Sequence, residues 1–182
     1  MSKLSIAVNG EDHLAGDPSA ECSLVEYGDY QCPYCGEAYP IVKRIQKHFG
    51  ERLLFVFRNF PLSQMHPWAE QAAEVAEFAG AKGKFWKMHD LLYENQESLG
   101  DALFLKLTET LELSPSQLET VTEEQTYRAR VRADFAGGVR SGVNGTPTFF
   151  INGERHNGPL DFDSLRKAIE RKLKLRTPSM RE

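Results

Sequence analysis

Hydrophobic positions change their spacing along the chain, and each spacing predicts a different element. Residues 23–27 form a short apolar run and residues 53–57 a continuous one, which predicts two strands. The aromatic content of the second run favours a strand buried on both faces of a sheet that helices cover. Between them the pattern is helical over residues 37–50, with these apolar positions: Ala38, Val42, Ile45 and Phe49.

A long helical pattern occupies residues 64–143. Ser114 followed by Pro115 is typical of a helix N-terminus, because serine caps free backbone N–H groups and proline fits the first helical position. Towards the end of this block, apolar residues recur at every fourth position: Tyr127, Val131, Phe135 and Val139. This repeat predicts one more helix with a continuous buried face.

The spacing changes again after the helical block. Residues 148–151 predict a strand, and Asn152-Gly153 is the preferred two-residue turn of a β-hairpin. Residues 154–157 would then form the short return strand. Asp161 is suited to cap a last helix.

The predicted order is strand, helix, strand, helical block, hairpin and helix. This order is typical of an α/β protein in one layered unit, with helices inserted in the middle. We expect three parts: residues 1–63 and 144–182 as the halves of the α/β unit, and residues 64–143 as the helical insertion.

Composition limits the function classes. The chain has 182 residues, of which 41% are hydrophobic and 10% aromatic, enough for a substantial core and against wholesale disorder. Its net charge of −4 gives no electrostatic basis for binding nucleic acid. The sequence contains neither a stretch of about 20 apolar residues, as a membrane helix needs, nor a secretory signal pattern. We therefore expect no membrane partner and a cytoplasmic location as written, or a periplasmic or secreted one if a signal has been removed.

Three cysteines are present, Cys22, Cys32 and Cys35, too few for a disulfide scaffold. Cys32-Pro33-Tyr34-Cys35 lies where a strand is predicted to lead into a helix. A cysteine at a helix N-terminus faces unpaired N–H groups and the positive end of the helix dipole, both of which favour the thiolate. We expect Cys32 to be exposed and nucleophilic, and Cys35, one turn later, to point inward and resolve a mixed disulfide.

Other interpretations of these residues exist. A Cys-x-x-Cys pair can be half of a zinc site, although the remaining cysteine and histidines form no second pair, or it can be structural. Cys22 is interpreted as a bystander and His66 as a loop residue. On local sequence alone, Pro147 would be an ordinary trans loop proline, because X-Pro bonds are rarely cis.

Two motifs together carry a family resemblance. Cys-Pro-Tyr-Cys after a strand, and Gly145-Thr146-Pro147-Thr148 before a closing hairpin and helix, resemble the thioredoxin fold. The helical block, and residues 25–31 leading into the cysteines, resemble the DsbA-like branch of that superfamily. The resemblance implies a thioredoxin fold, a central mixed sheet flanked by helices, with an inserted helical subdomain.

The resemblance also implies roles for particular residues. Cys32 matches the attacking cysteine and Cys35 the resolving one. Pro147 matches a cis-proline that faces the pair, with Thr146 before it, in a segment that presents backbone groups to a substrate chain. Pro33 and Tyr34, between the cysteines, are also expected at the substrate-binding surface.

Glu26, six residues before Cys32, matches an acidic residue that the DsbA-like pattern places near the cysteine pair. A buried carboxyl has a raised pKa and can exchange protons with Cys35. The alternative is an exposed glutamate at the end of a strand.

The function expected is thiol–disulfide exchange with protein or small thiol substrates, in an oxidising or reducing direction that the sequence leaves open. We expect no cofactor beyond the redox-active disulfide, with glutathione or a redox partner protein as candidate coupling partners. One alternative is a glutathione-dependent transferase or isomerase of the same fold, which would not generally need Cys35. Another is a metal or iron–sulfur binding module that uses the same cysteines.

Overall fold

The computed structural model describes residues 2–176, and a five-stranded sheet lies at its centre. The strands follow the order β1-β3-β2-β4-β5 across the sheet. The central pair, β2 and β3, is parallel, and every other pairing is antiparallel. The strand bounds are His13–Ala15 (β1), Cys22–Gly28 (β2), Leu53–Asn59 (β3), Thr148–Ile151 (β4) and Glu154–Arg155 (β5).

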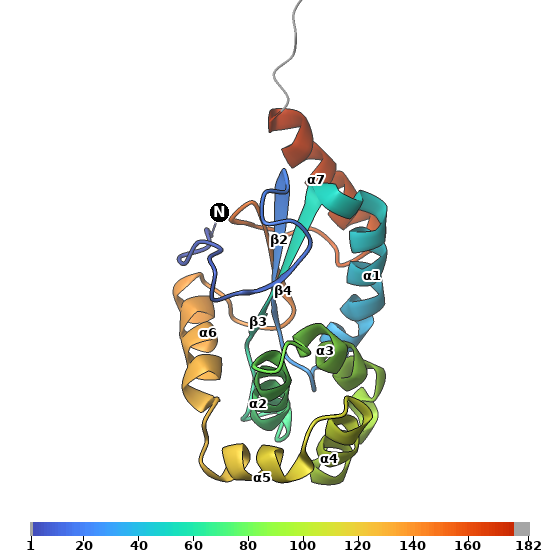
Figure 1. Ribbon diagram of the computed structural model, residues 1–182. Helices are drawn as coiled ribbons and strands as arrows, with labels where there is room; N and C mark the ends of the chain where they lie inside the picture. The colour runs from blue at the N-terminus through green and yellow to red at the C-terminus, as the bar shows by residue number, and fades with distance from the viewer. Residues whose placement is uncertain (1, 177–182) are drawn as a thin grey trace, which may run out of the picture.

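Helices surround this sheet unequally. The helices α1 and α7 lie along one side and α6 along the other, while α2 to α5 gather at one end of the molecule (Figure 1). Their bounds are Pro33–Phe49 (α1), Ala69–Gly80 (α2), Phe85–Glu94 (α3), Asp101–Thr110 (α4), Pro115–Glu123 (α5), Arg128–Arg140 (α6) and Phe162–Arg176 (α7). Short 3-10 helices occupy Gly50–Arg52 (η1) and Gln96–Ser98 (η2).

The two central strands are buried on both faces, which the continuous apolar run predicted for residues 53–57. Along β3, Phe55 and Phe57 face the larger core, which they share with α1, α7 and the helical block. The intervening Leu54 and Val56 face a smaller core on the side of α6. Because successive side chains of a strand point to opposite faces, one uninterrupted run supplies both cores.

The local turn and capping signals are confirmed. The Ser114 hydroxyl accepts a hydrogen bond from the Gln117 N–H at 3.3 Å, at the start of α5. Asn152 and Gly153 have φ values of 48° and 78°, as a tight hairpin turn requires, and they join β4 to β5. The α/β fold class is also confirmed, because the five strands form one mixed sheet and the helices α2 to α6 are inserted between β3 and β4.

Three local predictions were incomplete or wrong. β1 was not predicted, because three residues at a sheet edge are too few to show a period. The return strand β5 covers two residues rather than residues 154–157. Val139 is 54% exposed, although Val131 is buried. An exact four-residue repeat drifts around a helix of 3.6 residues per turn, so its last member turns towards solvent.

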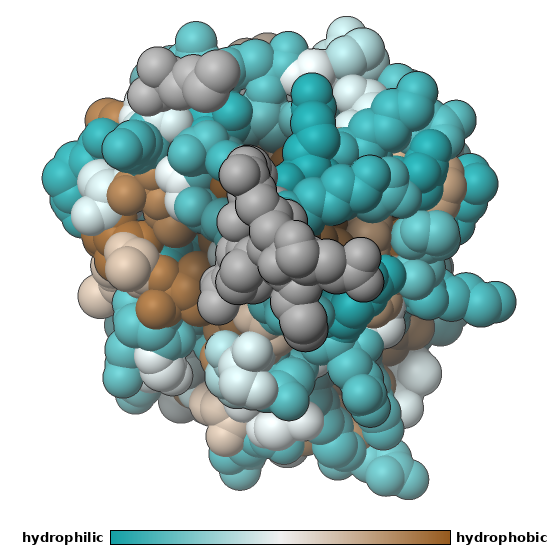
Figure 2. Space-filling model, turned by 90° about the horizontal axis from the view of Figure 1, so that it is seen from above, coloured by the Kyte–Doolittle hydropathy of each residue, from teal (hydrophilic) through white to brown (hydrophobic). Residues whose placement is uncertain are grey.

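The surface carries few large exposed hydrophobic side chains. Seen from the end of the molecule where α7 lies, it is mostly hydrophilic, with hydrophobic residues gathered towards one side (Figure 2). Within residues 2–174, the large hydrophobic side chains that are exposed are Tyr34, Met65 and Val139. None of the helices in this range is both long and apolar enough to span a membrane.

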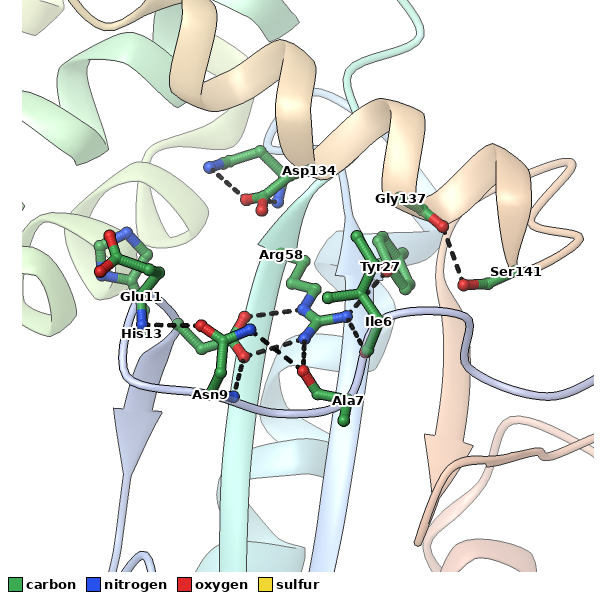
Figure 3. Close-up of polar contacts among 12 residues, drawn as sticks. Ile6, Ala7, Asn9, Glu11, His13, Tyr27, Arg58, Asp134, Gly137 and Ser141 are labelled. Atoms are coloured by element: carbon green, nitrogen blue, oxygen red, sulfur yellow. Dashed lines mark hydrogen bonds and ion pairs between the residues drawn. The ribbon is translucent and has the colours of Figure 1, made fainter.

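A buried arginine ties the N-terminal segment to the sheet. Arg58 of β3 is 2% exposed and forms a bidentate ion pair with Asp12, with N–O distances of 2.7 and 2.8 Å. The same guanidinium donates to the hydroxyl of Tyr27 and to the carbonyl groups of Ile6 and Ala7 (Figure 3). Every N–H group of the guanidinium thus has an acceptor, which offsets the free-energy cost of burying its charge.

The first prediction concerns this anchor. Arg58→Lys keeps the charge but loses the planar fork that binds Asp12 and the carbonyl groups together. We expect the free energy of unfolding to fall by about 2–4 kcal/mol, as measured by urea denaturation. The matched control Arg132→Lys, at a side chain that is 68% exposed, should change it by less than about 0.5 kcal/mol. Equal effects of the two substitutions would contradict the anchoring role.

Candidate active site

Cys32 stands at the junction between the loop after β2 and the start of α1. It is the N-cap residue of α1, and Pro33 occupies the first turn. Its carbonyl group accepts the N–H groups of Cys35 and Gly36 at 3.0 and 3.1 Å. The sequence therefore forms the predicted strand, loop and helix, and places the Cys32 side chain at the positive end of the helix dipole.

The surroundings of Cys32 favour its thiolate. They lower the pKa of Cys32 to about 5, chiefly because the Cys35 thiol donates a hydrogen bond to it. The side chain of Thr146 and the backbone N–H groups of Tyr34 and Cys35 add to this effect, while partial burial opposes it. A thiolate therefore forms at neutral pH.

The prediction that Cys32 is exposed was wrong. The residue is only 3% exposed, because the segment before β4 lies against it. The Cys32 thiol donates to the carbonyl oxygen of Thr146 at 3.4 Å, across 114 residues of sequence. The peptide bond between Thr146 and Pro147 is cis, as the family resemblance implied.

Thr146 also brings a hydroxyl group to the cysteine. Its Oγ1 is buried and has no hydrogen-bond partner within the described part of the chain. An unpaired buried hydroxyl loses its hydration without replacement, which is costly. A thiolate on Cys32 gives this hydroxyl an acceptor, which agrees with the contribution of Thr146 to the low pKa of Cys32.

Cys35 has the opposite environment. It is fully buried on α1, as predicted, and its pKa is raised by burial first and then by the neighbouring Cys32 and Glu26. One polar contact opposes this: the backbone N–H of Asp29 points to the Cys35 sulfur at 3.4 Å. The two sulfurs of one turn therefore differ strongly in their preference for the charged form.

Glu26 lies in the interior of β2 and is 3% exposed, so it is not an exposed glutamate at a strand end. Burial raises the pKa of Glu26 to about 8, and negative charge on Cys32 adds to this. The residue borders a small pocket of about 100 Å³, which Tyr39, His89 and Tyr93 also line. That volume is large enough to hold water beside the carboxyl group.

Asp29 and His66 are site residues that the sequence analysis did not assign. The Asp29 carboxylate is buried and accepts the N–H groups of Gln31 and Leu62 at 2.8 and 2.9 Å. His66, interpreted from sequence as a loop residue, contacts the same carboxylate through Nδ1 at 2.7 Å. Asp29 thus joins the loop before Cys32 to the loop between β3 and α2. The position of Asp29 directly after an apolar strand was the one sequence feature that indicated its burial.

Of the remaining residues singled out from the sequence, Pro33 and Tyr34 lie beside the cysteine pair and Cys22 lies far from it. Pro33 and Tyr34 are on the surface beside the cysteines, with Tyr34 65% exposed. Cys22 is buried at the start of β2, six residues before the strand ends, which places it about 20 Å from the strand end near Cys32. Within residues 2–176, no group of three or more His, Cys, Asp or Glu side chains is placed to hold a metal ion.

This fold and site define a class of protein. A Cys-x-x-Cys pair at the start of a helix, opposite a cis-proline and on a thioredoxin-type sheet, is the arrangement of a thiol–disulfide oxidoreductase. A family model described as Thioredoxin matches residues 8–171. The chain therefore belongs to the thioredoxin family.

Two solved structures share the fold of this chain over almost its whole length. Oxidised BdbD from Bacillus subtilis superposes with a TM-score of 0.85 at 25% identity, covering 95% of this chain and 97% of BdbD. The α-DsbA1 protein of Wolbachia pipientis has a TM-score of 0.81 over 94% of this chain and 95% of its own, and at 18% identity it supports the fold alone.

This chain is also similar to one part of a much longer curated protein. A protein of Salinispora arenicola (strain CNS-205), named Na(+)/H(+) antiporter NhaA 1, is 41% identical over 158 residues. That match covers 87% of this chain and 24% of the relative. The chain therefore spans about a quarter of the length of this curated relative, and the name describes the longer protein.

The second prediction concerns the charge on Cys32. The ultraviolet absorbance of the thiolate in the reduced protein should titrate with a midpoint near pH 5. Cys32→Ser should abolish this step, whereas the matched control Cys22→Ser should leave it in place. A midpoint near the ordinary cysteine pKa of about 8.5 would contradict the proposed stabilisation.

The third prediction concerns Glu26. The pKa of Glu26 is about 8 in the folded protein and about 4.5 in the unfolded chain, so folding stability is lost as pH rises from about 4.5 to about 8. Glu26→Gln carries no charge and should not show this loss. Above about pH 8 its unfolding free energy should therefore exceed that of the wild type by on the order of 3–5 kcal/mol, relative to the difference at pH 4.

Urea denaturation of both proteins across this pH range tests the Glu26 prediction. Glu37→Gln, at an exposed position of α1, is the control and should follow the wild-type curve. Parallel curves for Glu26→Gln and the wild type would contradict the raised pKa of Glu26 in the folded protein.

Proposed function

We propose that this protein exchanges disulfides with protein or small thiol substrates through Cys32 and Cys35. The observation that carries the proposal is the opposite environment of the two sulfurs, with a pKa of about 5 for Cys32 and a raised pKa for buried Cys35. Such a pair has one sulfur that leaves readily as a thiolate and one that is kept as a thiol or in a disulfide.

The proposed reaction is a two-electron exchange. A substrate thiolate attacks the Cys32 sulfur of the oxidised pair, which forms a mixed disulfide and breaks the Cys32–Cys35 bond. Cys35 takes up a proton, for which buried Glu26 is the proposed donor. A second substrate thiolate then attacks the substrate sulfur, and Cys32 leaves as the stabilised thiolate. The substrate gains a disulfide, and the protein becomes a dithiol.

The substrate-binding surface is proposed around the segment that covers Cys32. The backbone of Thr146 and Pro147 would pair with an extended substrate segment as an added strand. Pro33 and the exposed Tyr34 would contact the same segment from α1. A polypeptide substrate fits this surface. Glutathione or a redox partner protein is proposed only as the coupling partner that oxidises Cys32 and Cys35 to the disulfide again.

We infer that the pair works as an oxidant. A pKa near 5 for the attacking cysteine lies between the values of about 7 for thioredoxin and about 3.5 for DsbA. Stabilising the thiolate stabilises the reduced protein, which makes the disulfide more oxidising. An oxidising pair functions in an oxidising compartment, so a periplasmic or secreted location agrees with the inference better than the cytoplasmic one.

The fourth prediction separates the roles of the cysteines. Cys35→Ser should accumulate a mixed disulfide with a protein substrate that contains a disulfide, because the Cys32 thiolate attacks that bond and no second cysteine resolves the product. Cys32→Ser should lose exchange, and Cys22→Ser should retain it. Non-reducing electrophoresis and mass spectrometry measure the adducts. Turnover retained by Cys32→Ser, or adducts at Cys22, would overturn the proposal.

A further inference from the structure

A glutamine from the helical insertion contacts the active-site loop directly. The Gln96 side chain in η2 donates through Nε2 to the carbonyl oxygen of Tyr30 at 2.8 Å and to that of Cys32 at 2.9 Å. Both partners are acceptors, so only the amide nitrogen can face them. One amide group therefore holds the backbone on either side of Gln31, in the segment that ends at Cys32.

The carbonyl oxygen of Cys32 accepts three hydrogen bonds. It already accepts the first-turn N–H groups of Cys35 and Gly36, so Gln96 supplies its third donor. A carbonyl oxygen carries partial negative charge, and this one belongs to the same residue as the sulfur that becomes a thiolate. A positive amide edge on that oxygen reduces its repulsion of the thiolate and fixes the position of Cys32 relative to the helix N-terminus.

Gly36 provides the space for this contact. A Cβ atom at position 36 would lie 2.2 Å from Oε1 of Gln96 and 3.0 Å from its Cδ, so the amide would have to move. The amide is the end of a flexible side chain and can move, but moving breaks its two hydrogen bonds. Gly36 lies inside α1, where glycine is otherwise unfavourable by about 1 kcal/mol relative to alanine.

We propose that Gln96 is a positioning residue of the redox site, which holds the carbonyl groups of Tyr30 and Cys32 so that the start of α1 stabilises negative charge on the Cys32 sulfur. The inference rests on the proposed function. It assigns the helical insertion a part in setting the redox equilibrium of a pair that lies outside it.

A double-mutant cycle tests the inference. Gln96→Ala and Gly36→Ala should each lower the equilibrium constant for reduction of the protein by glutathione, about fivefold, and each should raise the titration midpoint of Cys32. The double variant should match Gln96→Ala, because without the amide a methyl group at position 36 meets no side chain of Gln96. Gln71→Ala is the matched control, since its amide donates to Asp101 within the helical insertion, and it should keep the wild-type constants.

Gln96→Glu keeps the size of the side chain and replaces the donor with a carboxylate. It should shift both quantities further than Gln96→Ala, because negative charge then faces the two carbonyl groups. This variant decides the test if Gln96→Ala does not fold, as judged by circular dichroism. A purely structural role would change the unfolding free energy and leave the redox equilibrium constant unchanged.

The outcomes separate this inference from the proposed function. Wild-type protein without exchange activity and with an ordinary Cys32 midpoint would overturn the proposed function. An active wild type whose folded Gln96 and Gly36 variants keep the wild-type equilibrium constant would overturn only the positioning role. Additive effects in the double variant would show that Gly36 and Gln96 act independently, and would also contradict it.

Discussion

The stabilisation of negative charge on a nearly buried sulfur is the constraint on which the rest of this structure depends. Cys32 is 3% exposed, and burying a charge is costly unless hydrogen bonds replace the lost water. Here the donors are the Cys35 thiol, the backbone N–H groups at the start of α1 and the side chain of Thr146. These groups come from two distant parts of the chain. The low pKa of Cys32 therefore depends on the sheet, which brings the two parts together.

The fold holds this arrangement from several sides. β2 and β3 are buried on both faces and fix the loop that follows β2. Asp29 ties that loop to the β3–α2 connection through Leu62 and His66, and Gln96 ties it to the helical insertion. The insertion therefore contacts the redox site as well as enlarging the core. Burial raises the pKa of both Cys35 and Glu26, and this favours their uncharged forms beside the Cys32 thiolate.

Much of this could be predicted from sequence because it depends on local patterns. The central strands, α1, the hairpin turn at Asn152-Gly153 and the cysteine pair all follow from spacing or short motifs. The cis form of Pro147 followed from the family resemblance and not from local sequence. The burial of Cys32 could not be predicted, because its cover lies 114 residues away. Contacts such as those of His66 with Asp29 and of Gln96 with Cys32 also depend on how distant segments pack.

The central claim is that the surroundings of Cys32 stabilise the reduced form and make the pair an oxidant. The measurement that tests it most directly is the reduction potential of the Cys32–Cys35 pair, from equilibration of the wild-type protein with glutathione. The account predicts a value closer to the roughly −120 mV of DsbA than to the roughly −270 mV of thioredoxin. A value near or below that of thioredoxin would contradict it.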